Sequence, residues 1–319
     1  MKPNVLCSVW ISEEALKKLE KVANVETRFG GGTLPKQELL KIVGKFDGVI
    51  IGGECFDKEV INAASRLKVI SRRGVGYDKV NIQAASERGI YVTLTPVNAE
   101  TVADVTFGLI LAVARKIPQA HFYVKDGEWE TKKSNADFRG LDVFGKTIGI
   151  IGLGRIGSIM AKRARGFDMD VLYNDLIRND RLEEDLRLKF VRLDNLLSNA
   201  DVITIHTSLN EKTKGMIGEK ELRTMKKTAI LINTARGPIV DQTALYSALK
   251  ERWIAGAGLD VFMEEPLNSD DPLLALDNVV LLPHIGSETI ECRKRMSMIC
   301  VDNTIRALRG EKPIYCVTS

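Results

Sequence analysis

Short apolar runs alternate with amphipathic segments along the chain, a pattern typical of α/β folds with a largely parallel sheet. In the first part of the chain, four such runs predict strands at Val5–Val9, Val49–Ile51, Leu67–Ile70 and Ile90–Leu94. Helices are predicted between them. Ser12 can cap a helix that runs to about Ala23, Asp57 can cap a helix over Lys58–Ala64, and Asn81–Arg88 is followed by Gly89.

The alternation is interrupted by a long amphipathic helix, predicted from about Thr101 to Arg115, and by a break at Pro118. It resumes at Thr147, where strands are predicted near residues 147–151, 170–174, 202–206, 229–233, 257–260 and 279–282. Helices are predicted near residues 156–165, 194–199, 241–252, 270–275 and 287–309. A chain of 319 residues with this pattern is long enough for two domains.

Composition narrows the class of protein. The net charge of +4, from 46 basic and 42 acidic residues, gives no reason to expect a nucleic-acid or membrane partner. The five cysteines are scattered without CxxC spacing, so we expect no metal site and reduced thiols in the cytoplasm. Met1-Lys2-Pro3 leads directly into a strand-like run, so no signal peptide is expected, and no apolar run approaches the length of a membrane span.

A glycine motif predicts a dinucleotide site. The apolar run Thr147–Ile151 leads into Gly152-Leu153-Gly154-Arg155-Ile156-Gly157 and then into a helix, which is GxGxxG in its required strand–turn–helix context. The first glycine, Gly152, permits the tight turn, Gly154 lets the backbone approach a pyrophosphate, and Gly157 lets helix and strand pack closely. Glycine-rich turns also end ordinary helices, but the context favours the cofactor.

The acid at the end of the next strand bears on the choice of cofactor. Asp175 can accept hydrogen bonds from the adenine-ribose hydroxyls and would repel a 2′-phosphate. We therefore expect NAD as the cofactor, although the nearby Arg178 leaves use of NADP open.

One of the three histidines stands out. His121 falls on the polar side of a helix-like segment, and His206 ends an apolar strand where a cofactor-lining or a packed histidine would both fit. His284 follows the run Val279–Leu282, which places it at the carboxyl end of a parallel strand, where open α/β sheets bind ligands.

Arg236 and Glu265 follow two other predicted strands, so both should lie at the same sheet edge as His284. Hydride addition to a 2-keto acid needs a proton donor, which imidazole provides near neutral pH, and a nearby carboxylate favours its protonated form. Arginine can bind the substrate carboxylate. Each residue alone also has a structural explanation, since Arg236 could form a surface ion pair and Glu265-Pro266 a simple turn.

These motifs, in this order, resemble the D-isomer-specific 2-hydroxyacid dehydrogenases essentially from end to end. The resemblance rests on Gly74–Asp78, Thr101–Arg115, Gly145–Gly157, Asn233–Gly237, Gly258–Phe262 with Glu265-Pro266, and Pro283–Ser287. It implies two Rossmann-like domains with a cleft between them: a flavodoxin-like substrate domain, residues 1–98 plus 287–319, and a doubly wound NAD-binding domain, residues 99–286. It also implies a homodimer formed through the NAD-binding domain.

The resemblance implies roles for individual residues. Arg236 would bind and polarise the substrate, Glu265 would pair with His284, and His284 would be the acid/base. Backbone N–H groups of Val75 and Gly76 would hold the substrate carboxylate. Asp260 would bind the nicotinamide carboxamide, and further positions match cofactor-lining residues: Thr106, Arg155, Ile156, Thr207, Thr234, Ala235, Gly286 and, more weakly, Thr213.

The implied activity is hydride transfer between NAD(H) and a small D-2-hydroxy or 2-keto acid. Phosphoglycerate dehydrogenases usually carry two phosphate-binding arginines, of which only Arg72 has a match here. We therefore favour glyoxylate or hydroxypyruvate, with 3-phosphoglycerate next. A non-catalytic NAD-sensing protein and oxidation of formate or phosphite are the remaining alternatives.

Overall fold

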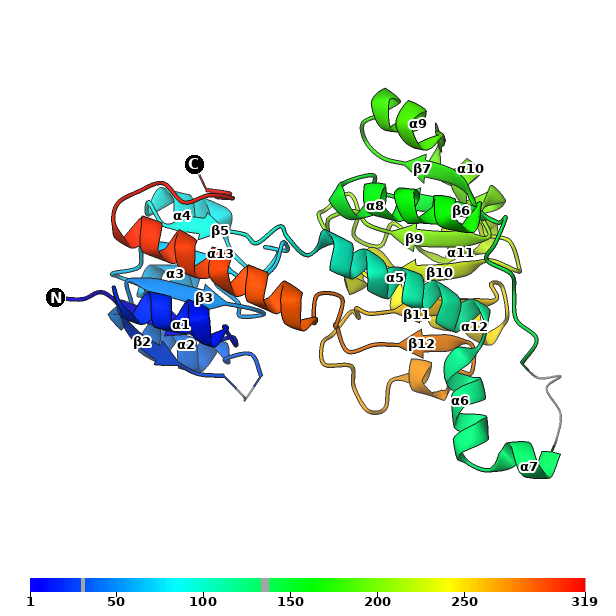
Figure 1. Ribbon diagram of the computed structural model, residues 1–319, viewed down its shortest axis with the longest axis horizontal. Helices are drawn as coiled ribbons and strands as arrows, with labels where there is room; N and C mark the ends of the chain where they lie inside the picture. The colour runs from blue at the N-terminus through cyan, green and yellow to red at the C-terminus, as the bar shows by residue number, and fades with distance from the viewer. Residues whose placement is uncertain (30–31, 133–137, 319) are drawn as a thin grey trace. The chain divides into compact units, whose positions relative to one another are not determined.

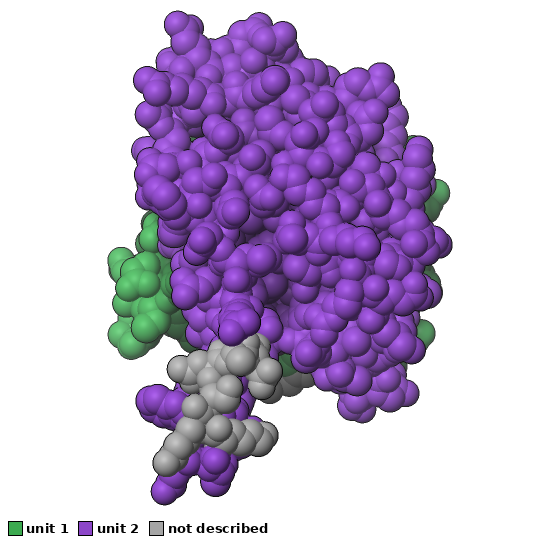
Figure 2. Space-filling model, turned by 90° about the vertical axis from the view of Figure 1, so that its right-hand side faces the viewer, with its two compact units in different colours: residues 1–98, 287–319 green, residues 99–286 purple. Residues whose placement is uncertain are grey.

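The computed structural model describes residues 1–29, 32–132 and 138–318, and the chain divides into two compact units. Unit 1 comprises Met1–Asn98 and Ser287–Ser319, and unit 2 comprises Ala99–Gly286 (Figures 1 and 2). Each unit is built on one sheet, and the named strands in the described residues pair only in parallel. The α/β fold class predicted from the alternation is confirmed.

Unit 1 has a five-stranded sheet in the order β2-β1-β3-β4-β5. Its strands are β1 Asn4–Cys7, β2 Asn24–Thr27, β3 Gly48–Ile51, β4 Val69–Arg72 and β5 Tyr91–Thr93. Its helices are α1 Glu13–Glu20, α2 Lys36–Ile42, α3 Lys58–Ala63, α4 Ile82–Glu87 and α13 Ile290–Leu308. The sheet is buried on both faces, as expected for parallel strands that read as continuous apolar runs.

The two faces of this sheet are covered by different helices. On β1, Val5 and Cys7 pack with α1 and α13, whereas Leu6 packs with α2 and α3 on the other face. The alternation follows from the period of two along a strand. Helix α13 belongs to unit 1 although it follows unit 2 in the sequence, and the hydroxyl oxygens of Ser71 and Thr304 hydrogen-bond at 3.0 Å to connect it with β4.

Unit 2 has a seven-stranded sheet in the order β12-β11-β10-β9-β6-β7-β8 (Figure 1). Its strands are β6 Thr147–Ile151, β7 Asp170–Asn174, β8 Leu188–Phe190, β9 Val202–Ile205, β10 Ile230–Asn233, β11 Gly256–Leu259 and β12 Val279–Leu281. From β6, the chain first adds strands on one side of the sheet, beginning with β7, and then on the other side, beginning with β9. Such a switch point is where doubly wound sheets place a nucleotide crevice.

The helices of unit 2 cover both faces of its sheet. They are α5 Ala99–Ala114, α6 Ile117–Lys125, α7 Glu128–Lys132, α8 Arg155–Ala164, α9 Asp180–Leu186, α10 Leu193–Asn199, α11 Glu219–Thr224 and α12 Gln242–Lys250. Helices α5 and α8 pack on one face, and α10, α11 and α12 on the other. Helices α6 and α7 project from the body of unit 2 as an arm (Figures 1 and 2). Among the described residues, no helix is both long and apolar enough to cross a membrane.

Candidate active site

The carboxyl ends of three neighbouring strands in unit 2 carry the predicted catalytic side chains. Strands β10, β11 and β12 are adjacent and in register, with Leu259 of β11 paired to Asn233 on one side and to Leu281 on the other. Arg236 and His284 each follow their strand by three residues, and Glu265 follows β11 after a short loop. Parallel strands therefore bring the three residues to one sheet edge.

His284 and Glu265 are in direct contact. The Nδ1 atom of His284 lies 2.7 Å from Oε2 of Glu265, and the other carboxylate oxygen accepts a hydrogen bond of 3.1 Å from the Phe262 backbone N–H. Burial opposes ionisation of Glu265, but the hydrogen bond and charge of His284 and the charge of Arg236 outweigh it. The pKa of Glu265 is consequently lowered below its usual value. An ionised carboxylate thus faces one ring nitrogen of His284.

Arg236 occupies a backbone turn that Asn233 fixes. The Asn233 side chain accepts a hydrogen bond from the Ala235 N–H at 3.0 Å and donates one to the Arg236 carbonyl at 2.9 Å. Asn233 is buried at the end of β10, so the turn is anchored in the sheet. The half-buried Arg236 is held on the strand end that neighbours Glu265.

Asp260 organises the loop that carries His284. Its two carboxylate oxygens accept hydrogen bonds from the backbone N–H groups of Ile285 and Gly286, at 2.7 and 2.8 Å. Burial raises the pKa of Asp260 above its usual value, against the lowering effect of these two N–H groups. His284 itself adopts φ = 55°, a left-handed conformation that is uncommon outside glycine and that this loop maintains.

The glycine motif has the geometry its sequence predicts. Gly152 adopts φ = 94°, and a Cβ there would lie 2.7 Å from the Thr207 backbone nitrogen. A Cβ on Gly157 would lie 2.0 Å from the Gly152 carbonyl oxygen, so only glycine allows α8 to approach β6 this closely. Gly154, in contrast, faces open space, which leaves its backbone accessible to a ligand. Arg155 and Ile156 begin α8 beside it.

Asp175 lies directly after β7, the strand next to the glycine turn. Its Oδ2 accepts a hydrogen bond of 2.6 Å from the Leu153 N–H, which joins the acid to the glycine loop. Leu176 and Ile177 follow it, and their apolar side chains are 89% and 78% exposed. This pair was not predicted from the sequence, although two apolar residues directly after a strand-terminal acid are a usable signal, because ligand sites are lined mainly by apolar side chains.

The other predicted cofactor residues of unit 2 differ in their surroundings. The hydroxyl groups of Thr106 and Thr234 hydrogen-bond at 2.9 Å, so α5 is tied to the end of β10. Thr207 is half-buried beside Gly152. Thr213 instead stabilises its own loop, where its hydroxyl donates to the Ser208 carbonyl at 2.7 Å.

Val75 and Gly76 belong to unit 1, where they follow β4 after Gly74. The Gly74 N–H donates a hydrogen bond of 2.7 Å to the Thr95 hydroxyl, which fixes the start of this turn. Both residues are half-buried. Their role in holding a substrate carboxylate stays a prediction.

The two remaining histidines lie elsewhere in unit 2. His206 packs inward, with Nδ1 buried and Nε2 2.8 Å from the Thr204 hydroxyl, and burial lowers its pKa to about 3. His206 is thus a half-buried, hydrogen-bonded side chain, and a cofactor-lining role for it stays untested. His121 is exposed on α6, where it helps to line an apolar pocket.

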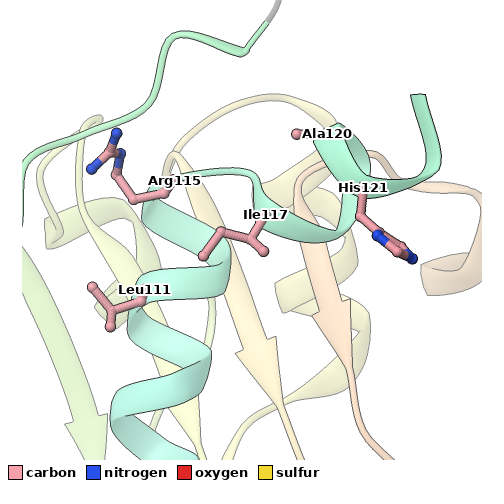
Figure 3. Close-up of a pocket in the computed structure, with 5 residues that line it drawn as sticks. All are labelled: Leu111, Arg115, Ile117, Ala120 and His121. Carbon is pink, nitrogen blue, oxygen red and sulfur yellow. The ribbon is translucent and has the colours of Figure 1, made fainter. Parts of the chain in front are cut away.

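That pocket is formed by the end of α5 and by α6 (Figure 3). Its lining residues are Leu111, Arg115, Ile117, Ala120 and His121. None of the predicted catalytic residues is among them. In the described part of the chain, no group of three or more His, Cys, Asp or Glu residues could hold a metal ion.

Comparison with known proteins places this geometry in a family. Residues 107–286 match the model of the D-isomer specific 2-hydroxyacid dehydrogenase NAD binding domain. The chain is also 45% identical over 315 residues to a glyoxylate reductase of Korarchaeum cryptofilum, covering 98% of this chain and 95% of that protein. The chain belongs to the D-isomer-specific 2-hydroxyacid dehydrogenases. The resemblance seen in the motifs is thereby confirmed.

Solved structures support the same conclusion. The TT0316 protein of Thermus thermophilus matches with a TM-score of 0.91 and 42% identity, covering 99% of this chain and all of that chain. An NADPH-dependent glyoxylate/hydroxypyruvate reductase of Sinorhizobium meliloti, solved with NADP and malonate, matches with a TM-score of 0.87 and 30% identity over 99% of this chain and 97% of that chain. As a family member, this chain is an oxidoreductase that acts on CH–OH donors and uses a nicotinamide dinucleotide.

Unit 2 fits that cofactor. The open backbone at Gly154 and the N-terminus of α8 suit a pyrophosphate, since helix-terminal N–H groups favour negative charge. Asp175 stands where ribose hydroxyls bind in this fold, and the exposed Leu176 and Ile177 lie beside it. All of these groups come from β6, β7 and the turns that follow them.

Proposed function

We propose that this enzyme reduces glyoxylate or hydroxypyruvate to the corresponding D-2-hydroxy acid with NADH. The observation that carries the proposal is the 2.7 Å contact between His284 and Glu265, on strand ends next to that of Arg236. A proton donor, its acidic neighbour and an anion-binding group are what reduction of a 2-keto acid requires.

The roles of the residues follow from their chemistry. A nicotinamide dinucleotide bound by unit 2 would supply the hydride for reduction of the keto acid. His284 donates a proton to the oxygen that becomes the hydroxyl, and Glu265 orients the ring and stabilises its protonated form. Arg236 binds the substrate carboxylate by charge-assisted hydrogen bonds.

Unit 1 is proposed as the substrate domain, and unit 2 as the NAD-binding domain. The backbone N–H groups of Val75 and Gly76 would share the substrate carboxylate with Arg236. Because Gly74 is fixed to Thr95, this turn is preorganised within unit 1. A Gly76→Pro variant removes one N–H group and should raise the KM for glyoxylate. An unchanged KM would contradict this assignment.

NAD is proposed as the preferred cofactor over NADP. The carboxylate of Asp175 would accept hydrogen bonds from ribose hydroxyls and repel a 2′-phosphate. Use of NADP by the Sinorhizobium relative makes the comparison with NADPH necessary. A kcat/KM for NADPH equal to that for NADH would overturn the preference without affecting the reaction class.

A homodimer formed through unit 2 is also proposed. The arm carries exposed apolar side chains at Ile117, Phe122, Val124 and Trp129, and Ile117 also lines the apolar pocket of Figure 3. Large apolar patches of this kind mark association surfaces. Light scattering should give the mass of two chains, and Phe122→Glu should shift the protein toward one chain. A monomeric wild type would exclude the dimer.

The cytoplasm is the proposed location, because all five cysteines are free thiols, as in a reducing compartment. Recovery of the protein in an extracellular or membrane fraction would contradict this.

The decisive experiment is a spectrophotometric panel. Glyoxylate, hydroxypyruvate, 3-phosphohydroxypyruvate, formate and phosphite are tested with the matching form of NAD(H) or NADP(H). Activity should be highest with glyoxylate or hydroxypyruvate, and His284→Asn should lower it at least ~100-fold while NADH still binds. Preference for the phosphorylated acid would reassign the substrate. NADH binding without turnover of any acid would favour a non-catalytic, NAD-sensing role.

A further inference from the structure

The loop after β7 contains two groups with opposite effects on a 2′-phosphate. Asp175 repels it, but Arg178, three residues later, carries the charge that accommodates this phosphate in NADP-binding relatives of the fold. The choice between the cofactors therefore depends on whether Arg178 is available.

Arg178 is already engaged by an acid of α9. Its Nε donates to Glu183 Oε1 at 2.9 Å and its Nη2 donates to Glu183 Oε2 at 2.9 Å. This is a bidentate pair, the geometry in which a guanidinium and a carboxylate bind most strongly. Asp180 adds a second acidic contact at 2.9 Å, but it is 83% exposed and is therefore well screened by solvent.

Glu183 is in turn anchored to the sheet. The hydroxyl group of Tyr173, a fully buried residue of β7, donates a hydrogen bond of 2.7 Å to Glu183 Oε1. The same hydroxyl accepts a hydrogen bond of 2.9 Å from the Asn179 N–H. The Glu183 side chain is only 15% exposed, and its bonds to Arg178 and Tyr173 lower its pKa, so it remains an anion. It cannot follow Arg178 toward a ligand without leaving Tyr173.

We infer that Glu183 is a specificity-determining positioning residue that disfavours NADP(H) by holding Arg178 on α9. Arg178 must break the bidentate pair before it can reach a 2′-phosphate beside Asp175. While this pair is intact, NADP(H) gains no contact from Arg178, and NAD(H), which has no 2′-phosphate, needs none. This inference rests on the proposed preference for NAD and identifies a second cause for it besides repulsion by Asp175.

The test is Glu183→Gln, which removes the charge but keeps an oxygen for the Tyr173 hydroxyl. Dissociation constants for NADPH and NADH are measured by fluorescence titration at low ionic strength, together with the melting temperature. We expect NADPH to bind about three- to fivefold more tightly, a modest gain because the Arg178 side chain is 60% exposed and its ion pair is screened by solvent, while NADH affinity is unchanged. If Glu183 had a purely structural role, Glu183→Gln would lower the binding affinities for NADPH and NADH equally.

Two further variants test whether Arg178 mediates the effect. Arg178→Gln alone should bind NADPH as the wild type does, because the held arginine contributes nothing to it. The double variant Glu183→Gln/Arg178→Gln should lose the gain. Glu219→Gln is the matched control. Glu219 pairs with Arg223 at 2.8 Å on α11, so this substitution removes the same charge from another ion pair of unit 2.

Three outcomes would overturn the inference. They are an unchanged NADPH affinity in Glu183→Gln, a gain that survives in the double variant, and a loss of NADPH affinity in Arg178→Gln alone. If the wild type binds NADPH as tightly as NADH, both the inference and the NAD preference fail, but the reductase activity stands. If Glu183→Gln melts far below the wild type, Asp180→Asn provides the same test with a smaller expected gain, because it loosens Arg178 without touching Tyr173.

Discussion

Glu265 holds His284 through one carboxylate oxygen, at 2.7 Å, while its other oxygen is fixed by the Phe262 N–H at 3.1 Å. The carboxylate therefore cannot rotate without losing a backbone contact. Because Nδ1 of the imidazole is occupied by Glu265, Nε2 is the ring nitrogen that would donate the proton in the proposed reaction.

The first prediction concerns this pair. Glu265→Gln should lower the kcat for glyoxylate reduction at least about tenfold, because a neutral amide does not stabilise the protonated imidazole. The lowered pKa of Glu265 keeps the wild-type carboxylate ionised, so the difference should persist from neutral pH down to about pH 5. Steady-state kinetics across that range measure it. Glu264→Gln, a change at the exposed neighbouring acid, should leave kcat unaltered, and equal kcat in all three proteins would refute the pairing role.

The second prediction concerns Asp260. An asparagine can accept only one of the two N–H groups of Ile285 and Gly286, so Asp260→Asn leaves a buried N–H opposite an N–H₂ group. We expect the free energy of unfolding to fall by about 1–3 kcal/mol, measured by urea titration. The exposed Asp270 provides the control, because Asp270→Asn removes one charge from the same region. Wild-type stability in Asp260→Asn would show that the loop does not depend on this carboxylate.

The third prediction separates two glycines of the cofactor motif. Gly157→Ala should destabilise unit 2, since its Cβ would lie 2.0 Å from the Gly152 carbonyl oxygen. Gly154→Ala should fold normally but bind NADH more weakly, because the added methyl group would occupy space left for the pyrophosphate. Gly166→Ala has open space around it and should change neither property. Thermal melting with and without NADH measures both effects, and normal NADH affinity in Gly154→Ala would place the cofactor elsewhere.

The fourth prediction is a pH dependence of stability. Burial lowers the pKa of His206 to about 3, whereas the unfolded chain takes up a proton near the ordinary value of about 6.5. Between these values the unfolded state binds more protons, so the free energy of unfolding falls as the pH falls. In His206→Gln, the free energy of unfolding should fall less steeply as the pH falls. The difference from the wild type should be up to about 1.4 kcal/mol per pH unit. The exposed His121 gives the control variant His121→Gln, and identical pH profiles for all three proteins would contradict the assignment.

Strands buried on both faces were predictable from the sequence. Strands β6, β9 and β10 are inner strands of the sheet in unit 2. Each is an apolar run in the sequence and lies where a strand was predicted. Strand β2, with the burial pattern exposed–half-buried–half-buried–exposed, lies at a sheet edge and gave no such signal. Strand β8, at one edge of the sheet in unit 2, has only three residues with the burial pattern buried–exposed–half-buried, so it also lacks an apolar run and was missed.

Helix limits and solvent-exposed helices were harder to predict. The helix capped by Ser12 ends at Glu20 rather than near Ala23, and the predicted helix at 270–275 is a short 3₁₀ turn, Pro272–Ala275. Helix α9 has no fully buried residue, so its sequence lacks the apolar stripe from which a helix could be predicted. The arrangement of Glu183 and Arg178 could not be predicted because it depends on that helix.

The candidate catalytic site was easier to predict than the cofactor edge. Residues that follow adjacent parallel strands must meet at one edge, so the sequence placed His284 and Glu265 together. Contacts between loops have no comparable rule. The bond from the Leu153 N–H to Asp175, and the burial of Nδ1 of His206, became visible only with the structure.

The return of α13 to unit 1 has a consequence for synthesis on the ribosome. Residues 1–98 emerge before unit 2, but Val5, Cys7 and Ile50 pack against Cys300, Val301 and Ile305, which are translated after it. Unit 2 is continuous in sequence and can complete its core while the nascent N-terminal sheet still lacks its covering helix. A premature stop codon before Ile290 would therefore leave an apolar sheet face exposed, and such truncated chains should be captured by chaperones or degraded rather than accumulate as a partly active enzyme.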